Sequence, residues 1–171
     1  VVGAGFIGRS WAMVFSKAGH HVSLYDIDPA ALSEAMNLLE INIADLESNG
    51  LISSKDDLLG RIQPYKTLEG AVDEAEWVQE NALENVQIKR ELFSRMDELL
   101  PETTILASST SAISCSDISN GMKGAGRIIV AHPANPPYLL PIVELSGAPE
   151  TKDETIIRAK ELFEAADMEV I

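Results

Sequence analysis

The sequence predicts an α/β fold in which helices cover both faces of a mostly parallel, doubly wound β-sheet. Short apolar runs alternate with amphipathic helical stretches along the 171 residues, as expected when parallel strands are joined by crossover helices. Pro29 suits the first turn of one helix and Pro101 ends another, so prolines mark helix boundaries. A chain of this length is expected to form one domain with a sizeable core.

The expected elements follow this alternation in order. The apolar runs predicted to be strands are Val1–Val2, His21–Tyr25, Glu76–Gln79, Thr104–Ala107, Arg127–Val130, Ile142–Leu145 and Met168–Ile171. The amphipathic stretches predicted to be helices are Ile7–Lys17, Pro29–Ser48, Asn85–Leu100 and Thr151–Ala165.

Two segments depart from the alternation. The stretch from Pro29 to about Gly60 is too long for one crossover helix, so we expect it to project as a helical arm. Between Ile27 and Ser54 it has no Lys or Arg and carries five acids, namely Asp28, Glu34, Glu40, Asp45 and Glu47. The segment His132–Pro141 holds four prolines in ten residues and is expected to be a stiff loop, because proline fixes φ and lacks a donor.

Composition narrows the classes of function. The net charge of −14 argues against binding to nucleic acid, whose phosphates are bound by Lys and Arg. No apolar run is long enough to span a bilayer, and we expect no signal peptide. The single cysteine, Cys115, cannot form an internal disulfide and fits a reducing cytoplasm. With no basic residue near it in sequence, a buried structural role is expected rather than a reactive thiol.

Both ends indicate part of a longer protein. Val1–Val2 has the character of a strand end whose first residues are absent, and the chain stops after the apolar run Met168–Ile171. We therefore expect a fragment that comprises one domain, residues 1–171.

A glycine-rich motif points to a dinucleotide cofactor. Gly3-Ala4-Gly5-Phe6-Ile7-Gly8 follows a strand end, opens a helix, and is followed by a second strand that ends at Asp26, 18 residues past Gly8. This context, rather than the glycines alone, is the fingerprint of a Rossmann-type domain. We expect Gly3 to permit the tight turn, Gly5 to admit the pyrophosphate, and Gly8 to let helix and strand pack. The contacts expected from this loop are Gly3, Gly5, Phe6, Ile7 and Gly8.

The helix that follows this loop supplies N–H donors and partial positive charge, so an acidic chain can still bind an anionic cofactor. Asp26 is expected to accept hydrogen bonds from the adenosine ribose, and Ile27-Asp28-Pro29 offers no Arg for a 2′-phosphate. These features favour NAD over NADP. The alternative is that Asp26 caps the helix that begins at Pro29.

His132 is the histidine in an unusual setting, because it ends an apolar strand and begins the proline-rich loop. Glu144 lies 12 residues on, within the apolar run Pro141–Leu145, where a buried carboxylate needs a partner. If the two strands are neighbours, Glu144 orients the His132 ring and strengthens it as a general base. The alternative is a structural histidine beside a surface glutamate. His20 and His21 are expected to be solvated, and we expect no metal site.

The motifs together resemble one enzyme family over essentially the whole chain. Ser109-Thr110-Ser111, His132-Pro133-Ala134-Asn135-Pro136-Pro137 and Val143-Glu144 resemble the L-3-hydroxyacyl-CoA dehydrogenase family in order and spacing. The run that continues through Tyr138 and Leu140-Pro141-Ile142-Val143-Glu144 is similar to its λ-crystallin and L-gulonate 3-dehydrogenase branch.

The resemblance implies roles for individual residues. His132 matches the general base, Glu144 its orienting carboxylate, and Ser111 the serine that hydrogen-bonds the reacting oxygen. Glu84 and Lys89 match residues near the nicotinamide ribose, with a solvated helix start as their alternative, whereas strand-end capping is the alternative for Ser111. Ser109 stands where the acyl-CoA enzymes commonly have Asn, which puts that expected cofactor contact in doubt.

The implied activity is NAD-dependent oxidation of the 3-hydroxyl group of a 3-hydroxy acid or 3-hydroxyacyl thioester. The resemblance also implies a C-terminal helical domain that completes the active site and forms a homodimer, so the fragment alone is expected to bind NAD without turnover. The acidic arm would repel coenzyme A, which favours a free hydroxy acid resembling L-gulonate. The alternatives are an acyl-CoA dehydrogenase of fatty-acid oxidation, a non-catalytic structural protein of the crystallin kind, and a nucleotide sensor.

Overall fold

The computed structural model describes all residues from Val1 to Ile171 and contains seven strands and seven α-helices. The strands are β1 (Val22–Tyr25), β2 (Ile62–Tyr65), β3 (Trp77–Glu80), β4 (Ile105–Ser108), β5 (Ile128–Pro133), β6 (Ile142–Gly147) and β7 (Glu169–Val170). The helices are α1 (Phe6–Lys17), α2 (Pro29–Ser48), α3 (Lys55–Gly60), α4 (Leu68–Val72), α5 (Val86–Leu99), α6 (Cys115–Ser119) and α7 (Asp153–Ala165). A single 3-10 turn, η1, covers Ala125–Arg127.

The sheet is mostly parallel, as predicted. β1 pairs with β2, and β3, β4 and β5 pair in that order, all in parallel. Val2 joins the two groups, since it forms parallel bridges with Tyr25 at the end of β1 and with Glu80 at the end of β3. The exception is β6, which runs antiparallel to β5 and carries β7 at the sheet edge.

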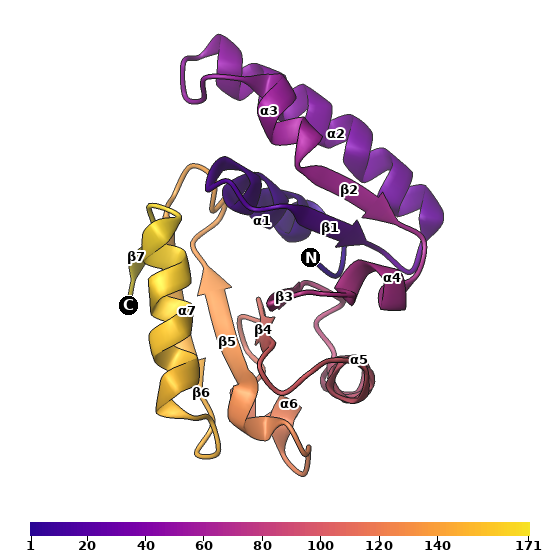
Figure 1. Cartoon of the computed structure of the whole chain (residues 1–171), viewed down its shortest axis with the longest axis vertical. Coiled ribbons are helices and arrows are strands. Elements are labelled where there is room, and N and C mark those ends of the chain that lie inside the picture. Colours follow the sequence, from indigo (N-terminus) through magenta and orange to yellow (C-terminus); the bar gives the residue numbers. More distant parts are fainter.

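Helices cover both faces, which confirms the doubly wound prediction (Figure 1). One apolar cluster joins α1, α2 and α7 to one face of the sheet, with Trp11, Phe15 and Phe163 in mutual ring contact. A second cluster joins α4, α5 and α6 to the other face through Phe93, Met96 and other apolar side chains. No helix combines the length and the apolar character needed to cross a membrane.

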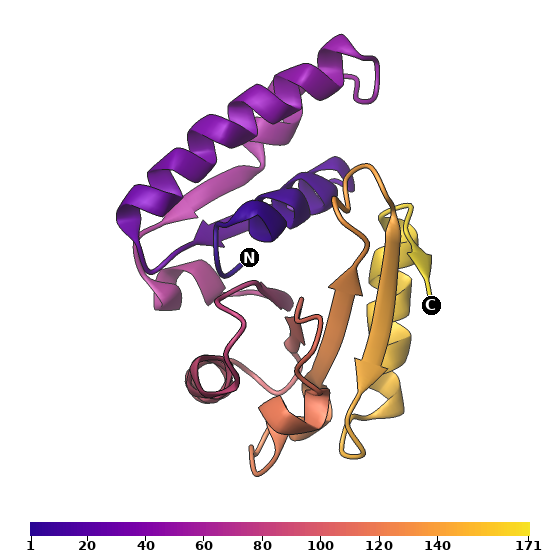
Figure 2. The ribbon, with the colours of Figure 1, turned by 180° about the vertical axis from the view of Figure 1, so that it is seen from behind.

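The expected helical arm is formed by α2 and α3, and it is anchored along one side. The buried stripe of α2 belongs to the main core and consists of Leu32, Ala35, Leu39, Ile43 and Leu46. Only the far end of α2 and the turn into α3 extend beyond the rest of the molecule in the two opposite views (Figures 1 and 2). The five acids of this segment are all exposed, so the arm presents its negative charge to solvent.

The sequence analysis missed strand β2, which contains Pro64. Proline cannot donate a hydrogen bond and is tolerated at a sheet edge, where β2 lies. The short helices α4 and α6 were also missed, and each is preceded by a threonine or serine that caps a backbone N–H. Helix α2 begins at Pro29 as predicted, with Asp28 as its cap.

Candidate active site

The glycine-rich loop has the three-part geometry expected of it. Gly3 has φ of +91°, and a Cβ there would lie 2.6 Å from the carbonyl oxygen of Asn81. A Cβ on Gly8 would lie 1.8 Å from the Gly3 carbonyl oxygen, so only glycine allows helix α1 to approach the loop this closely. A Cβ on Gly5 would meet no atom within 4 Å. Gly3 and Gly8 therefore serve the fold, whereas Gly5 leaves backbone accessible from outside.

Asp26 is held against this loop at the end of β1. One carboxylate oxygen, Oδ2, accepts from the Ala4 N–H at 2.7 Å, and Oδ1 accepts from the Asp28 N–H at 2.9 Å. Each oxygen keeps a lone pair for a ribose hydroxyl. The alternative that Asp26 caps α2 is wrong, because the cap is Asp28, which accepts from the Ala30 N–H.

These residues fit a dinucleotide. The N–H groups of Phe6, Ile7 and Gly8 form the first turn of α1 and have no partner within the helix, so they provide donors for a pyrophosphate. Gly5 gives room for its approach, and Asp26 provides acceptors at the expected distance along the fold.

The general base predicted from the sequence has its predicted partner. His132 and Glu144 are directly opposed in the β5–β6 ladder, and His132 Nδ1 lies 2.7 Å from Glu144 Oε2. With Nδ1–H donated to the carboxylate, Nε2 is the nitrogen left to accept a proton. His132 is the second-to-last residue of β5, which runs parallel to β4, so it lies at the carboxyl edge of the sheet, where the glycine-rich loop also lies.

The reason given for this pairing needs correction. Glu144 was expected to be buried, but its side chain is 60% exposed and that of His132 is 28% exposed. The two groups meet because antiparallel register places them opposite each other, not because burial forces Glu144 to find a partner.

Ser111 lies in a loop after β4 that a carboxylate organises. Glu84 Oε1 accepts from Thr110 Oγ1 at 2.5 Å and from the N–H groups of Ser111 and Ala112 at 3.2 and 3.3 Å. Partial burial raises the pKa of Glu84, but the bonds from this loop and the charge of Lys89 outweigh burial and lower its pKa overall. The exposed Ser111 hydroxyl makes no hydrogen bond within the protein and is available to a substrate.

Lys89 is buried, so the alternative of a solvated helix start is wrong for this residue. Its Nζ donates to both oxygens of Glu80 at 2.8 and 3.0 Å and lies 3.6 Å from Glu84 Oε2. Glu80 also accepts from Ser108 Oγ and from the Ala82 N–H, both at 2.6 Å. The sequence analysis missed Glu80, whose signal was a carboxylate at the end of an apolar strand.

Ser109, in doubt as a cofactor contact, has its hydroxyl fully used within the protein. It accepts from Trp11 Nε1 and Gln79 Nε2 at 2.9 and 2.8 Å and donates to Asn81 Oδ1 at 2.7 Å. A serine hydroxyl offers one donor and two acceptor sites, so none is left for a cofactor.

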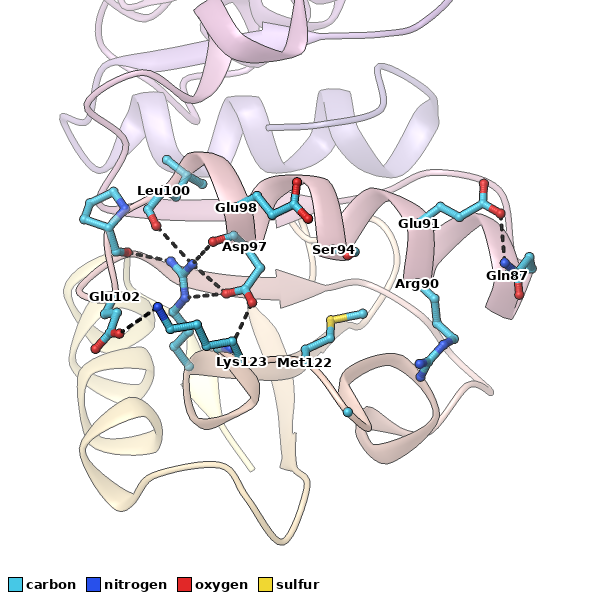
Figure 3. Close-up of a pocket in the computed structure, with 14 residues that line it drawn as sticks. Gln87, Arg90, Glu91, Ser94, Asp97, Glu98, Leu100, Glu102, Met122 and Lys123 are labelled. Atoms are coloured by element: carbon cyan, nitrogen blue, oxygen red, sulfur yellow. Dashed lines mark hydrogen bonds and ion pairs between the residues drawn. The ribbon is translucent and has the colours of Figure 1, made fainter.

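A separate groove lies away from these residues. It measures about 760 Å³ and lies between α5 and the segment that joins α6 to η1 (Figure 3). Arg127, one of the cations that line it, is already paired with Asp97 and with carbonyl groups at the end of α5. This groove contains none of the predicted site residues.

The other two histidines and the single cysteine lie as expected. His20 and His21 are exposed, and Cys115 is buried, with its pKa raised by that burial. No group of three His, Cys, Asp or Glu side chains is arranged to hold a metal ion.

The fold and the glycine-rich loop define a Rossmann-type dinucleotide-binding domain with a His/Glu pair at the carboxyl edge of its sheet. The family model described as "3-hydroxyacyl-CoA dehydrogenase, NAD binding domain" matches residues 1–171. The chain therefore belongs to this family, and NAD is its cofactor.

Curated relatives include members of the λ-crystallin branch that the sequence motifs indicated. A lambda-crystallin homolog from Bos taurus is 39% identical over 166 residues, which are 95% of this chain and 52% of the relative. L-carnitine dehydrogenase from Streptomyces griseus is 36% identical over 170 residues, which are 99% of this chain and 50% of the relative. The chain spans about half the length of these curated relatives.

A solved structure confirms the architecture. The crystal structure of 3-hydroxybutyryl-CoA dehydrogenase from Escherichia coli matches with a TM-score of 0.96 at 28% identity, over 100% of this chain and 36% of that chain.

Proposed function

We propose that the protein containing this domain oxidises the 3-hydroxyl group of a 3-hydroxy acid, or of its thioester, to a ketone. The observation that carries this proposal is the 2.7 Å contact between His132 and Glu144 at the carboxyl edge of the sheet. Ligands of doubly wound folds bind at this edge, and the glycine-rich loop opens onto it. A structural role alone would not require both a cofactor loop and a base beside it.

Three side chains, His132, Glu144 and Ser111, would carry out the protein's part of this reaction. Bound NAD would supply the hydride acceptor for oxidation of the carbinol carbon. His132 Nε2 takes the hydroxyl proton, and Glu144 holds the ring and stabilises the imidazolium that forms. The Ser111 hydroxyl, whose loop is fixed by Glu84, donates to the reacting oxygen.

Within this class we favour a free hydroxy acid over a coenzyme A thioester. The five exposed acids of the arm face solvent with no Lys or Arg between Ile27 and Ser54, and they would repel the phosphates of coenzyme A. One relative is an L-carnitine dehydrogenase, and L-carnitine is a free hydroxy acid. The structural similarity to the E. coli 3-hydroxybutyryl-CoA dehydrogenase supports a thioester as the second candidate substrate.

The proposal includes two further points. A cytoplasmic location is supported by the single buried cysteine. A homodimer formed through a C-terminal helical domain is supported by the family resemblance.

The test measures NADH formation by the full-length protein with L-gulonate, L-carnitine, 3-hydroxybutyrate and 3-hydroxybutyryl-CoA. His132→Ala should lower kcat at least about 100-fold, the usual contribution of a positioned base, and Glu144→Gln should lower it less. The Kd for NADH should barely change in either variant, and residues 1–171 alone should bind NADH without turnover. Normal turnover in His132→Ala, or oxidation of none of these substrates, would contradict the proposal.

A further inference from the structure

A partly buried polar network links the glycine-rich loop to strand β5. We define it as Trp11, Gln79, Asn81 and Ser109, centred on the Ser109 hydroxyl. Asn81 donates to the Val2 carbonyl from its backbone N–H at 2.7 Å and from Nδ2 at 3.3 Å. Val2 immediately precedes Gly3, so one end of the network lies at the glycine-rich loop.

The other end of the network lies beside the general base. Gln79 Nε2 donates both to Ser109 Oγ at 2.8 Å and to the carbonyl oxygen of Ala131 at 3.3 Å. Ala131 immediately precedes His132. The β4–β5 ladder ends at Ser108 and Val130, so Gln79 provides a bond to β5 just beyond the last ladder pair.

Every polar atom at the centre of this network is used. Gln79 is fully buried, its amide nitrogen has two acceptors, and its Oε1 accepts from Trp77 Nε1 at 3.0 Å. Trp11 is also fully buried and gives its single N–H to Ser109. Because an unpaired buried polar group is costly, such a network specifies one distance and orientation between the elements it joins. The β4–β5 ladder holds β5 up to Val130, and the Gln79 amide extends this hold to Ala131, the residue before His132.

We propose that Ser109, Gln79 and Trp11 are positioning residues that hold the carboxyl end of β5, and with it His132, in register with the glycine-rich loop. Hydride transfer requires the base and the cofactor to meet the same carbinol group, so this register controls turnover. The catalytic part of the inference rests on the proposed function. The positional part concerns only the geometry of His132.

The first measurement is independent of activity and uses NMR spectra of the full-length protein. The indole N–H signal of Trp11, identified by its loss in Trp11→Phe, should move in Ser109→Ala because its acceptor is removed. The ring signals of His132 should move in Ser109→Ala and in Gln79→Met, and return toward their original positions in Ser109→Thr, which keeps a hydroxyl. Unchanged His132 signals in both variants would overturn the inference.

The second measurement is steady-state kinetics on the same proteins. Misplacement of the base should lower kcat on the order of 10- to 100-fold in Ser109→Ala and Gln79→Met, with the Kd for NADH changed by no more than about twofold. Trp11→Phe keeps an aromatic ring but removes the N–H donor, and it should lower kcat in the same direction by a smaller factor. Ser94 is exposed, so Ser94→Ala is the matched control and should leave kcat unchanged.

The outcomes separate the two proposals. A wild-type protein that oxidises none of the hydroxy acids refutes the proposed function, and the His132 signals then decide the positional inference alone. An active wild type whose Ser109→Ala and Gln79→Met variants keep full kcat overturns the inference and leaves the proposed function intact.

Discussion

Gly5 and Gly8 lie three residues apart and have different roles in the structure. Gly8 allows close packing against the loop, and Gly5 leaves the backbone accessible to the cofactor, so alanine substitution should affect stability at one position and affinity at the other. In Gly8→Ala the new Cβ would lie 1.8 Å from the Gly3 carbonyl oxygen and 2.9 Å from its carbon. The first distance is roughly 1.5 Å short of an ordinary contact, and the obstructing atoms are backbone. One extra methyl group in a packed site costs about 1–3 kcal/mol when side chains adjust, so Gly8→Ala should lose about 3 kcal/mol or more of unfolding free energy.

Gly5→Ala should behave in the opposite way. Its backbone (φ −63°, ψ −170°) suits any residue and its Cβ would meet no atom within 4 Å, so stability should change by less than about 1 kcal/mol. The methyl group would instead cover the backbone that the pyrophosphate approaches, and the Kd for NADH should rise at least about tenfold, or roughly 1.4 kcal/mol.

The assay pairs urea unfolding, followed by tryptophan fluorescence, with an NADH titration well below both unfolding midpoints. Gly5→Ala should lose affinity without losing stability, and Gly8→Ala should lose stability. Equal destabilisation by the two substitutions, or NADH binding by Gly5→Ala as tight as in the wild type, would refute the division of roles.

Three further predictions follow from groups with defined partners. Asp26→Ser should narrow the preference for NADH over NADPH, which we expect to be roughly 30-fold, about 2 kcal/mol, by calorimetric titration; equal wild-type Kd values would contradict it. The pKa of Glu84 is lowered, so its bonds to the loop persist above its ordinary pKa and fail only as pH falls through the lowered value. The amide signals of Ser111 should therefore stay constant from neutral pH to about pH 5 in the wild type, and a transition near pH 6 would be inconsistent. Cys115, whose pKa is raised by burial, should resist a disulfide reagent at neutral pH until urea unfolds the protein, and rapid labelling of the folded protein would argue against this.

The sequence predicted correctly those elements that depend on residues adjacent in the chain. The glycine spacing, the strand that ends at Asp26 and the proline boundaries each follow from the chemistry of a few adjacent residues, and the structure confirms those elements. The prediction that His132 meets Glu144 also holds, since a stiff loop between two apolar runs makes a hairpin.

The sequence did not predict the burial or pairing of side chains where these depend on elements distant in the chain. The exposure of Glu144 depends on what covers β6, and the burial of Lys89 depends on the Glu80 carboxylate at the end of another element. Neither the exposure of Glu144 nor the ion pair between Lys89 and Glu80 produces a periodic pattern in the sequence. Strand β2 escaped prediction because Pro64 weakens the local signal, and only its place at the sheet edge makes that proline acceptable.

The exposed acids of α2 and the net charge of −14 have a consequence for how quickly the cofactor is captured. Their field repels an anionic dinucleotide at long range, whereas the N–H donors of α1 attract it only near contact. The acidic surface therefore slows the encounter with the cofactor, although the N–H donors of α1 favour its binding at contact. Added salt screens the repulsion beyond about 10 Å, so the association rate should rise with ionic strength, opposite to proteins that steer anions with basic patches.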